Sequence, residues 1–426
     1  MLDIKLIRES PDVVRNALER RNANAELMSQ LDKILEIDKE WRSIKKEEEQ
    51  LRAERNRLSL EINEKKKKGQ DISEIIKRSG EVSKRIKDIT SETETLDDQI
   101  KAEMLLLPNI PHDSVPDGKD ENDNRVERFW GTQRKHKTDV LDHHELGEKS
   151  GLIDFERGVK LAKHRFTALY GPVAKLERAL INFMLSVNTM HGYKEVAPPY
   201  LVNTKTMTGT GQLPKFHEDL YSTQDDLWLI PTAEVPLTNL YSGEILEEKH
   251  LPIKLTAFTA CFRREAGAYG KDIKGLIRQH QFDKVELVKF VIPETSQNEL
   301  EGLVKDAERI LQLLELPYRV ITLCTGDTGF SSAKTHDIEV WIPSQEKYRE
   351  ISSCSMFSDF QARRANLRYR CAEGEVKYLN TLNGSGLAVG RTLIAILENY
   401  QENQKTVVVP KVLRDFMGSE TIEFTI

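Results

Sequence analysis

The chain has 426 residues, of which 38% are hydrophobic and 31% charged, with a formal net charge of −6, so it exceeds one ordinary domain and should form two or three. No stretch approaches the roughly 18 apolar residues of a membrane span, and the N-terminus lacks the apolar run of a secretion signal, so we expect a soluble, cytoplasmic protein. The acidic total does not exclude nucleic-acid binding, because that depends on local basic patches.

The first hundred residues predict an antiparallel helical hairpin. Hydrophobic residues recur at steps of three and four on both sides of the break KKKKGQD at 65–71, which keeps them on one stripe of each helix. The glycine at the break fits a reversal. Legs of roughly 37 residues would reach about 55 Å, too far to pack wholly on a globular core, so the hairpin should protrude. The stripe consists of Ile34, Ile37, Trp41, Ile44, Leu51, Leu58 and Ile62, then Ile72, Ile75, Val82, Ile86, Ile89, Leu96 and Ile100, with Glu48 and Arg55 interrupting the first leg.

The tip of this hairpin is basic, with lysine at each position from 65 to 68 and Arg55 and Arg57 lower on the same leg. Two interpretations stay open. The lysines either form a solvated turn or contact the phosphates of a nucleic acid.

The remainder of the chain predicts an α+β domain around an antiparallel sheet. A Pro-, Asn- and Asp-rich segment at 105–118 ends the helical part. From about residue 150, strands such as LWLIP (227–231) and IEVWIP (338–343) mix irregularly with helices such as LERALINFMLSV (176–187). Neither phosphate-loop pattern, GxGxxG or GxxxxGK[ST], occurs in the sequence.

The four cysteines are expected to be free thiols in a reducing compartment. No two of them form a CxxC pair, and no Cys/His cluster has zinc-finger spacing. They are Cys261, Cys324, Cys354 and Cys371.

Two segments supply residues suited to ATP. The sequence FRRE (262–265) precedes a glycine-rich stretch and then RQHQF (278–282), so two strands joined by a loop would bring Arg263 to phosphates, Glu265 to the adenine amino group and Phe282 onto the ring. The alternative is a surface charge cluster. In GSGLAVGR (384–391), glycines precede an amphipathic helix and keep the backbone close to a ligand, with Arg391 in its first turns. The alternative is an ordinary helix start.

Two further segments supply acidic and hydroxyl groups. PTAE (231–234) follows a strand, and there Thr232 could simply cap a helix while Glu234 favours its dipole. EISS (350–353) ends a strand and offers oxygen ligands suited to magnesium with phosphate, or else only an exposed glutamate. Together, the four segments meet the needs of adenylate formation on an amino acid, in which two anionic reactants must be brought together.

In their order, these segments resemble the signature motifs of class II aminoacyl-tRNA synthetases, and more narrowly those of the seryl-tRNA synthetase family. GYKEVAPPYLV (192–202) is similar to motif 1, which builds the dimer interface; residues 261–286 are similar to motif 2 and 381–401 to motif 3. GTGQLPKF (209–216), PTAEVPL (231–237), residues 324–343 and EISSCS (350–355) are also typical of the family. The resemblance implies a class II antiparallel sheet with flanking helices, preceded by a long helical hairpin arm that binds tRNA.

The resemblance also implies roles for individual residues. ATP and Mg²⁺ would be the cofactors, and Arg263 and Arg391 would be catalytic. The serine-binding residues would be Thr232, Ala233, Glu234, Glu286, Thr381, Asn383 and Ser385. The ATP-binding residues would be Arg263, Arg264, Glu265, Phe282, Glu350, Ile351, Ser352, Ser353 and Arg391, with Glu350 and Ser353 on the metal.

These inferences predict three parts: an arm over 1–107, a connector over 108–149 and a catalytic domain over 150–426. The expected activity is serine activation and transfer to tRNA(Ser), and to tRNA(Sec) where present, by a homodimer of the zinc-free type. The alternatives are an amino-acid activator for a non-tRNA carrier, whose relatives lack the arm, and a non-catalytic RNA-binding paralogue, which would have lost the ATP residues. Two departures from the family pattern are Arg264, often small and polar there, and Met356, usually asparagine.

Overall fold

The computed structural model describes residues 1–135, 141–266 and 275–425. Part of the segment similar to motif 2 (267–274) and part of the predicted connector (136–140) therefore lie outside the described residues. Contacts divide the chain into two units, one of Leu2–Glu19 and Ala23–Pro108 and the other of Met1, Arg20–Asn22 and Asn109–Ile426. Within the described ranges, no helix combines the length and apolar character that crossing a membrane requires.

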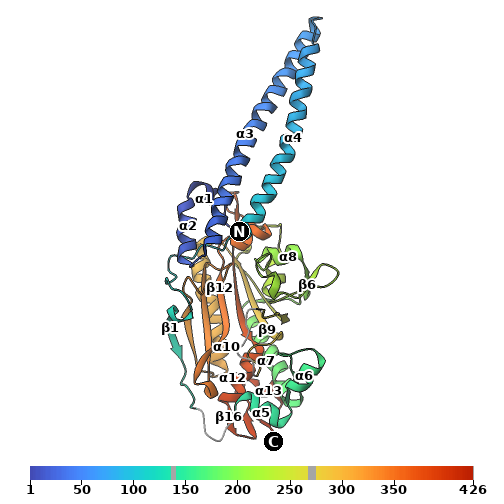
Figure 1. Cartoon of the computed structure of the whole chain (residues 1–426). Coiled ribbons are helices and arrows are strands. Elements are labelled where there is room, and N and C mark those ends of the chain that lie inside the picture. The colour runs from blue at the N-terminus through green and yellow to red at the C-terminus, as the bar shows by residue number, and fades with distance from the viewer. Residues whose placement is uncertain (136–140, 267–274, 426) are drawn as a thin grey trace. The chain divides into compact units, whose positions relative to one another are not determined.

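The N-terminal unit is built on two long antiparallel helices that lie side by side, α3 (Ala25–Lys67) and α4 (Ser73–Met104) (Figure 1). The predicted hairpin is confirmed, with Gly69 in the turn at a φ of +68°. Two shorter helices precede the pair, α1 (Ile4–Glu9) and α2 (Pro11–Arg20). The predicted stripe forms the seam between α3 and α4, where Leu58 packs with Val82 and Ile86.

Glu48, which interrupts the stripe, is buried in the seam. Its carboxylate receives hydrogen bonds from Lys45 at 3.0 Å and Arg52 at 2.6 Å on the same helix, and from Thr90 across the seam at 3.3 Å. These partners hold the pKa of Glu48 below its ordinary value, chiefly through the bond from Arg52. The carboxylate therefore stays charged although it faces the neighbouring helix.

The C-terminal unit is built on an eight-stranded sheet, which confirms the predicted α+β class. Its order is β1-β10-β11-β12-β15-β9-β8-β4, and every neighbouring pair is antiparallel except β4 with β8. In that order the strands are β1 (Arg125–Trp130), β10 (Tyr318–Thr322), β11 (Lys334–Ile342), β12 (Lys347–Met356), β15 (Asn380–Ala388), β9 (Gln281–Val291), β8 (Ile253–Phe262) and β4 (Lys194–Glu195).

Three helices cover one face of this sheet and enclose the main core. They are α7 (Gly171–Met190), α10 (Ser296–Leu313) and α12 (Val389–Asn399), and their apolar side chains pack against β9, β11, β12 and β15. The opposite face of β8 and β9 packs against two short helices, α9 (Glu234–Asn239) and α11 (Phe360–Ala365). The predicted helix at 176–187 lies within α7.

Smaller elements surround the sheet. In the described part of the chain, the remaining α-helices are α5 (His143–Ser150), α6 (Phe155–Leu161), α8 (Thr204–Gly209) and α13 (Arg414–Met417). The small sheets consist of β14 (Val376–Tyr378), β13 (Arg368–Arg370) and β7 (Ile245–Glu247); of β16 (Gln401–Asn403), β17 (Thr406–Val408) and β18 (Thr421–Glu423); of β2 (Ile153–Asp154) and β3 (Ala168–Leu169); and of β5 (Leu201–Asn203) and β6 (Leu227–Leu229). All four cysteines are buried free thiols.

Candidate active site

A cavity of about 700 Å³ opens on the face of the sheet opposite α7, α10 and α12. Successive side chains of a strand point to opposite faces. On β9, Lys284 and Glu286 therefore line the cavity, while Val285 and Leu287 join the core. The volume lies in the range of small-molecule sites.

One end of the cavity is strongly polar and buried. The Lys284 ammonium forms an ion pair with Glu286 at 2.6 Å and donates a hydrogen bond to the Thr232 hydroxyl at 2.9 Å. The Asn383 amide donates to Glu286 Oε1 at 3.0 Å. Burial raises the pKa of Glu286, and the neighbouring Lys284 partly opposes that rise.

Glu234, in the first turn of α9, adds a second buried carboxylate here. The Gln361 amide donates to Glu234 Oε1 at 2.6 Å, and Gln361 in turn accepts a hydrogen bond from Thr381 at 2.6 Å. Burial, together with the charge of Glu286, raises the pKa of Glu234 to about 7. Thr381 is therefore linked to Glu234 through Gln361. The hydrogen bond from Thr381 holds the Gln361 amide in one orientation.

The interpretation of Thr232 as a helix cap is modified by the structure. Its hydroxyl accepts a hydrogen bond from the backbone N–H of Glu234 at 3.2 Å, but the N-cap position of α9 belongs to Ala233. The same hydroxyl receives the Lys284 bond. Thr232 therefore serves the helix start and the cavity at once.

The other end of the cavity carries arginines. The Arg263 guanidinium lies 5.1 Å from the ring centre of Phe282 and donates to the carbonyl of Pro231 at 3.2 Å. Glu265 pairs with Arg278 at 3.1 Å. The antiparallel pairing of β8 with β9 explains this grouping, because it sets Phe262 opposite Gln281 and so joins two segments that the sequence separates.

Arg391 and Glu350 meet at the same end. Arg391 lies in the first turn of α12, as predicted, and donates to the carbonyl of Glu350 at 2.7 Å, with the Glu350 carboxylate 3.3 Å away. The Glu350 side chain keeps 49% of its surface exposed. Partial desolvation tends to raise its pKa, but the charges of Arg391 and Arg263 outweigh this effect and lower the pKa below its ordinary value. Residues 350–353 were expected at the end of a strand. They lie inside β12, which runs on to Met356.

Most of the predicted residues line this one cavity: Thr232, Glu234, Arg263, Glu265, Phe282, Glu286, Glu350, Ile351, Ser353, Asn383, Ser385 and Arg391. Four others do not. Ala233 packs in the apolar core beside α9, Thr381 lies behind Gln361, and the Arg264 side chain is exposed. Ser352 is buried, where its hydroxyl donates to the carbonyl of Ser385 at 2.6 Å.

Three residues that bind predicted site residues had no predicted role of their own. Lys284 could have been found, because it lies two residues from both Phe282 and Glu286 on one strand and so shares their face. Arg278 stands in the segment quoted for adenine binding, yet only the fold pairs it with Glu265. Gln361 directly follows Phe360, and no motif or spacing in the sequence singles it out.

Comparisons with known proteins match both units. Residues 1–111 match the model of the seryl-tRNA synthetase N-terminal domain, and residues 216–400 match the tRNA synthetase class II core domain (G, H, P, S and T). The serine–tRNA ligase of Fervidobacterium nodosum is 53% identical over 426 residues, covering 99% of each chain. The chain belongs to the seryl-tRNA synthetase family.

Relatives of this family from other organisms are similarly close. The serine–tRNA ligase of Methanosarcina barkeri is 54% identical over 98% of this chain and 97% of its own length. A crystal structure of seryl-tRNA synthetase from Pyrococcus horikoshii complexed with ATP superposes with a TM-score of 0.95 at 41% identity, covering 100% of both chains. The predicted class II synthetase fold is thereby confirmed.

The departure from the family pattern at Met356 lies behind the cavity wall. Met356 is buried in the main core, and its sulfur accepts a weak hydrogen bond from the Gln297 amide at 3.8 Å. The departure at Arg264 concerns an exposed side chain. Neither residue lines the cavity of this family member.

Proposed function

We propose that this chain uses ATP to activate L-serine as seryl-adenylate and then transfers the seryl group to the 3′ end of tRNA(Ser), and to tRNA(Sec) where present. The observation that carries the proposal is one cavity with buried carboxylates and hydroxyls at one end and arginines at the other. The similarity of this chain to serine–tRNA ligases extends over nearly its whole length and supports serine as the substrate.

The polar end is proposed as the serine site. The Glu234 and Glu286 carboxylates suit the ammonium group of the amino acid, while the hydroxyls of Thr232 and Ser385 suit its side chain. Thr381 and Asn383 support this end through Gln361 and Glu286. A pocket that hydrogen-bonds a hydroxyl leaves polar groups unpaired with alanine, which can cost on the order of 10⁴-fold.

The arginine end is proposed as the ATP site. Phe282 would stack on adenine and Glu265 would accept from its amino group, while Arg263 and Arg391 would neutralise the phosphates. The residues present also fit Mg²⁺. Among the described residues, no three His, Cys, Asp or Glu side chains form a metal-holding group, but Mg²⁺ commonly takes one or two protein oxygens and completes its shell with phosphate and water.

Glu350 and Ser353 would supply those oxygens, since both face the cavity. When bound, the ion adds positive charge at the phosphates. The chain's own contribution is to hold the serine carboxylate in line with the α-phosphate, so that a P–O bond forms as pyrophosphate leaves. The ribose hydroxyl of the terminal adenosine of tRNA then attacks the acyl carbon and displaces AMP. No covalent enzyme intermediate is required, because positioning and charge neutralisation lower the barrier.

The division of labour along the chain is also part of the proposal. Residues 1–107 would bind tRNA, 108–149 would connect, and 150–426 would catalyse. The protein would act as a homodimer through the segment at 192–202, and it would work in the cytoplasm, where its tRNA and ATP substrates are present.

Amino-acid selectivity provides the direct test. In ATP–pyrophosphate exchange, serine is expected to support turnover with a kcat/KM at least about 10³-fold above that of alanine, because alanine leaves the buried polar groups unpaired. Threonine and cysteine should also be far poorer substrates. Equal exchange with another amino acid would overturn the assignment to serine, and exchange without any transfer to tRNA would favour a different carrier.

The pH dependence tests the role of Glu234. Because its pKa is raised to about 7, the carboxylate is charged above that pH and neutral below it, and only the charged form attracts the serine ammonium. We therefore expect kcat/KM for serine to fall about tenfold per pH unit below pH 7. Glu234→Gln should give a low, flat profile over the same range.

Glu177→Gln is the matched control for this profile. Burial also raises the pKa of Glu177 to about 7, but Glu177 does not line the cavity. Its replacement should leave the profile unchanged. If the pH profile flattens in Glu177→Gln and persists in Glu234→Gln, the titrating group is Glu177 and not Glu234, which would contradict this proposal.

A further inference from the structure

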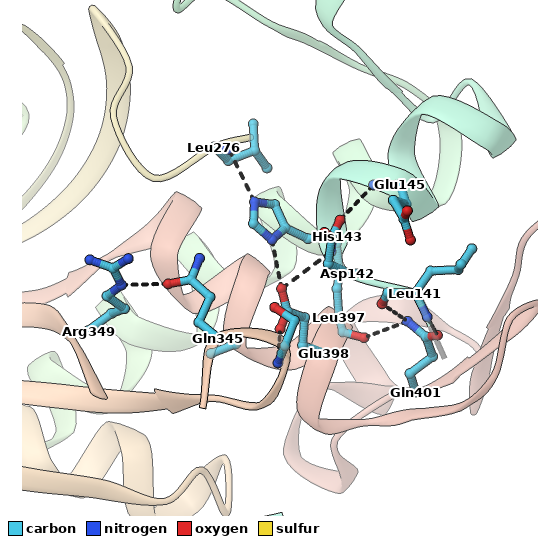
Figure 2. A network of polar contacts seen from close by, with 12 residues as sticks. Leu141, Asp142, His143, Glu145, Leu276, Gln345, Arg349, Leu397, Glu398 and Gln401 are labelled. Carbon is cyan, nitrogen blue, oxygen red and sulfur yellow. Dashed lines mark hydrogen bonds and ion pairs between the residues drawn. The ribbon is translucent and has the colours of Figure 1, made fainter. Parts of the chain in front are cut away.

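His143, the first residue of α5, forms a buried contact between the end of α12 and the segment that begins at Gly275. Its Nδ1 lies 2.7 Å from Glu398 Oε1, near the end of α12, and its Nε2 lies 3.4 Å from the backbone nitrogen of Leu276. Figure 2 shows the imidazole between these two partners. Both His143 and Glu398 are almost wholly buried.

The hydrogen bonds define the state of the ring. The Leu276 N–H can only donate, so Nε2 must be the unprotonated nitrogen, and the proton on Nδ1 is donated to Glu398. Glu398 is itself held by two backbone N–H groups, those of His143 at 3.3 Å and Ser344 at 3.0 Å. The carboxylate therefore fixes the ring, and the ring presents an acceptor to the Leu276 backbone.

Gly275 provides independent evidence that this approach is built into the chain. Its φ is +77°, a conformation that favours glycine, and a Cβ there would lie 2.2 Å from His143 Nε2. A side chain at 275 would therefore displace either the ring or the backbone. The close approach of residues 275 and 276 to His143 depends on a glycine at this position.

The segment that His143 holds leads directly into the cavity. Leu276 and Arg278 line the arginine end, where Arg278 pairs with Glu265 at 3.1 Å. Gln279 also holds this segment, because its amide donates to the carbonyl of Gly275 at 3.0 Å. A shift of the Leu276 backbone would thus move the Arg278–Glu265 pair, while the polar end around Glu234 belongs to other elements.

We propose that His143, held by Glu398, is a positioning residue that sets the 275–278 segment for ATP binding. The proposal rests on the proposed function, since it assumes that ATP occupies the arginine end. His143 touches no substrate in this proposal. It acts through the Leu276 backbone and the Arg278 side chain, so its loss should weaken ATP binding and leave serine binding intact.

The test uses the full-length protein and measures separately what the Nδ1 and the Nε2 contacts of His143 contribute. His143→Asn keeps a donor near Nδ1 for Glu398 but has no atom at the place of Nε2. It should raise the KM for ATP in serine-dependent exchange about tenfold, as expected for a misplaced binding group, with the KM for serine within about twofold. His143→Gln places an amide oxygen near Nε2 and should restore the KM for ATP to within about threefold of wild type.

Gln401→Leu is the matched control. Gln401 bonds the backbone of Leu141 at 2.7 and 3.0 Å, only two residues from His143, but does not contact Leu276 (Figure 2). It should leave both KM values unchanged. The proposal is overturned if His143→Asn leaves the KM for ATP at the wild-type value, if it raises both KM values equally, or if Gln401→Leu raises the KM for ATP as much.

A second variant covers the case in which His143→Asn does not fold. Gly275→Ala pushes the segment away from an intact His143–Glu398 pair, so it should also raise the KM for ATP selectively, and an unchanged value would contradict the proposal. Failure of the proposed function is distinguishable, because the wild-type protein would then show no serine-dependent exchange.

Discussion

Arg391→Ala is expected to lower serine-dependent pyrophosphate exchange by about 10²–10³-fold at saturating ATP, equivalent to roughly 3–4 kcal/mol in the barrier. The side chain lies in the cavity wall, and its guanidinium is fixed by the carbonyl and carboxylate of Glu350. A group fixed in this way needs no reorganisation when negative charge develops on the transferring phosphate. Stopped-flow or exchange measurements of adenylate formation would give the rate.

Two variants distinguish this role from a structural one. Arg414→Ala removes an arginine whose partner is Glu420 at 2.6 Å, outside the cavity, and should keep exchange within about twofold of wild type, because surface substitutions change stability by under about 0.5 kcal/mol. Arg391→Lys keeps the positive charge but loses the planar, two-pronged guanidinium. Its exchange activity should lie between those of Arg391→Ala and Arg414→Ala. If Arg391→Ala retains more than about a tenth of wild-type activity with a normal melting temperature, Arg391 is a surface residue.

Shortening the helical hairpin is expected to separate the two half-reactions. Removing residues 49–84 and closing the gap with a short Gly-Ser turn keeps the base of the hairpin, including the Glu47–Arg85 pair at 3.0 Å. Serine-dependent exchange should stay near wild type, while aminoacylation of tRNA(Ser) should fall by about 10²-fold or more, because contacts to RNA phosphates contribute much of the binding free energy.

The lysines at 65–68 decide between the two interpretations of the tip. Their replacement by alanine in the intact arm should raise the KM for tRNA and reduce its dependence on salt, if they contact phosphates. An unchanged salt dependence would make the tip a solvated turn. Normal charging by the shortened protein would show that tRNA is held elsewhere.

The sequence was sufficient to predict the helical hairpin, because a short-range rule governs it. The stripe of Ile, Leu and Val predicted α3 and α4 because helical spacing alone brings these residues onto one face. The chemistry of Arg263 and Glu350 suggested phosphate and magnesium binding, but each had a bland alternative, and only the order of the segments and the family resemblance decided the roles of these two residues. Their meeting in one cavity depends on strand pairing across long stretches of chain, which spacing cannot reveal.

The contacts that were missed are those made between distant segments. Nothing near Gln361 in the sequence points to Glu234, 127 residues away, and nothing near His143 points to Glu398, 255 residues away. Such pairs form only after the sheet has brought their elements together. The alternative that made Thr232 only a helix cap is incomplete for a related reason: the N-cap of α9 is Ala233, and the Thr232 hydroxyl also accepts a hydrogen bond from Lys284 of a different strand.

The position of β15 in the sheet has a consequence for synthesis on the ribosome. It is the last of the eight strands to be made, yet it lies between β12 and β9. Until residues 380–388 emerge, the nascent chain can form only two partial sheets, each with an unpaired inner edge that invites aggregation. A message truncated before this strand would therefore yield an aggregation-prone product, and completion of the sheet and of the cavity wall must wait until most of the chain has left the exit tunnel.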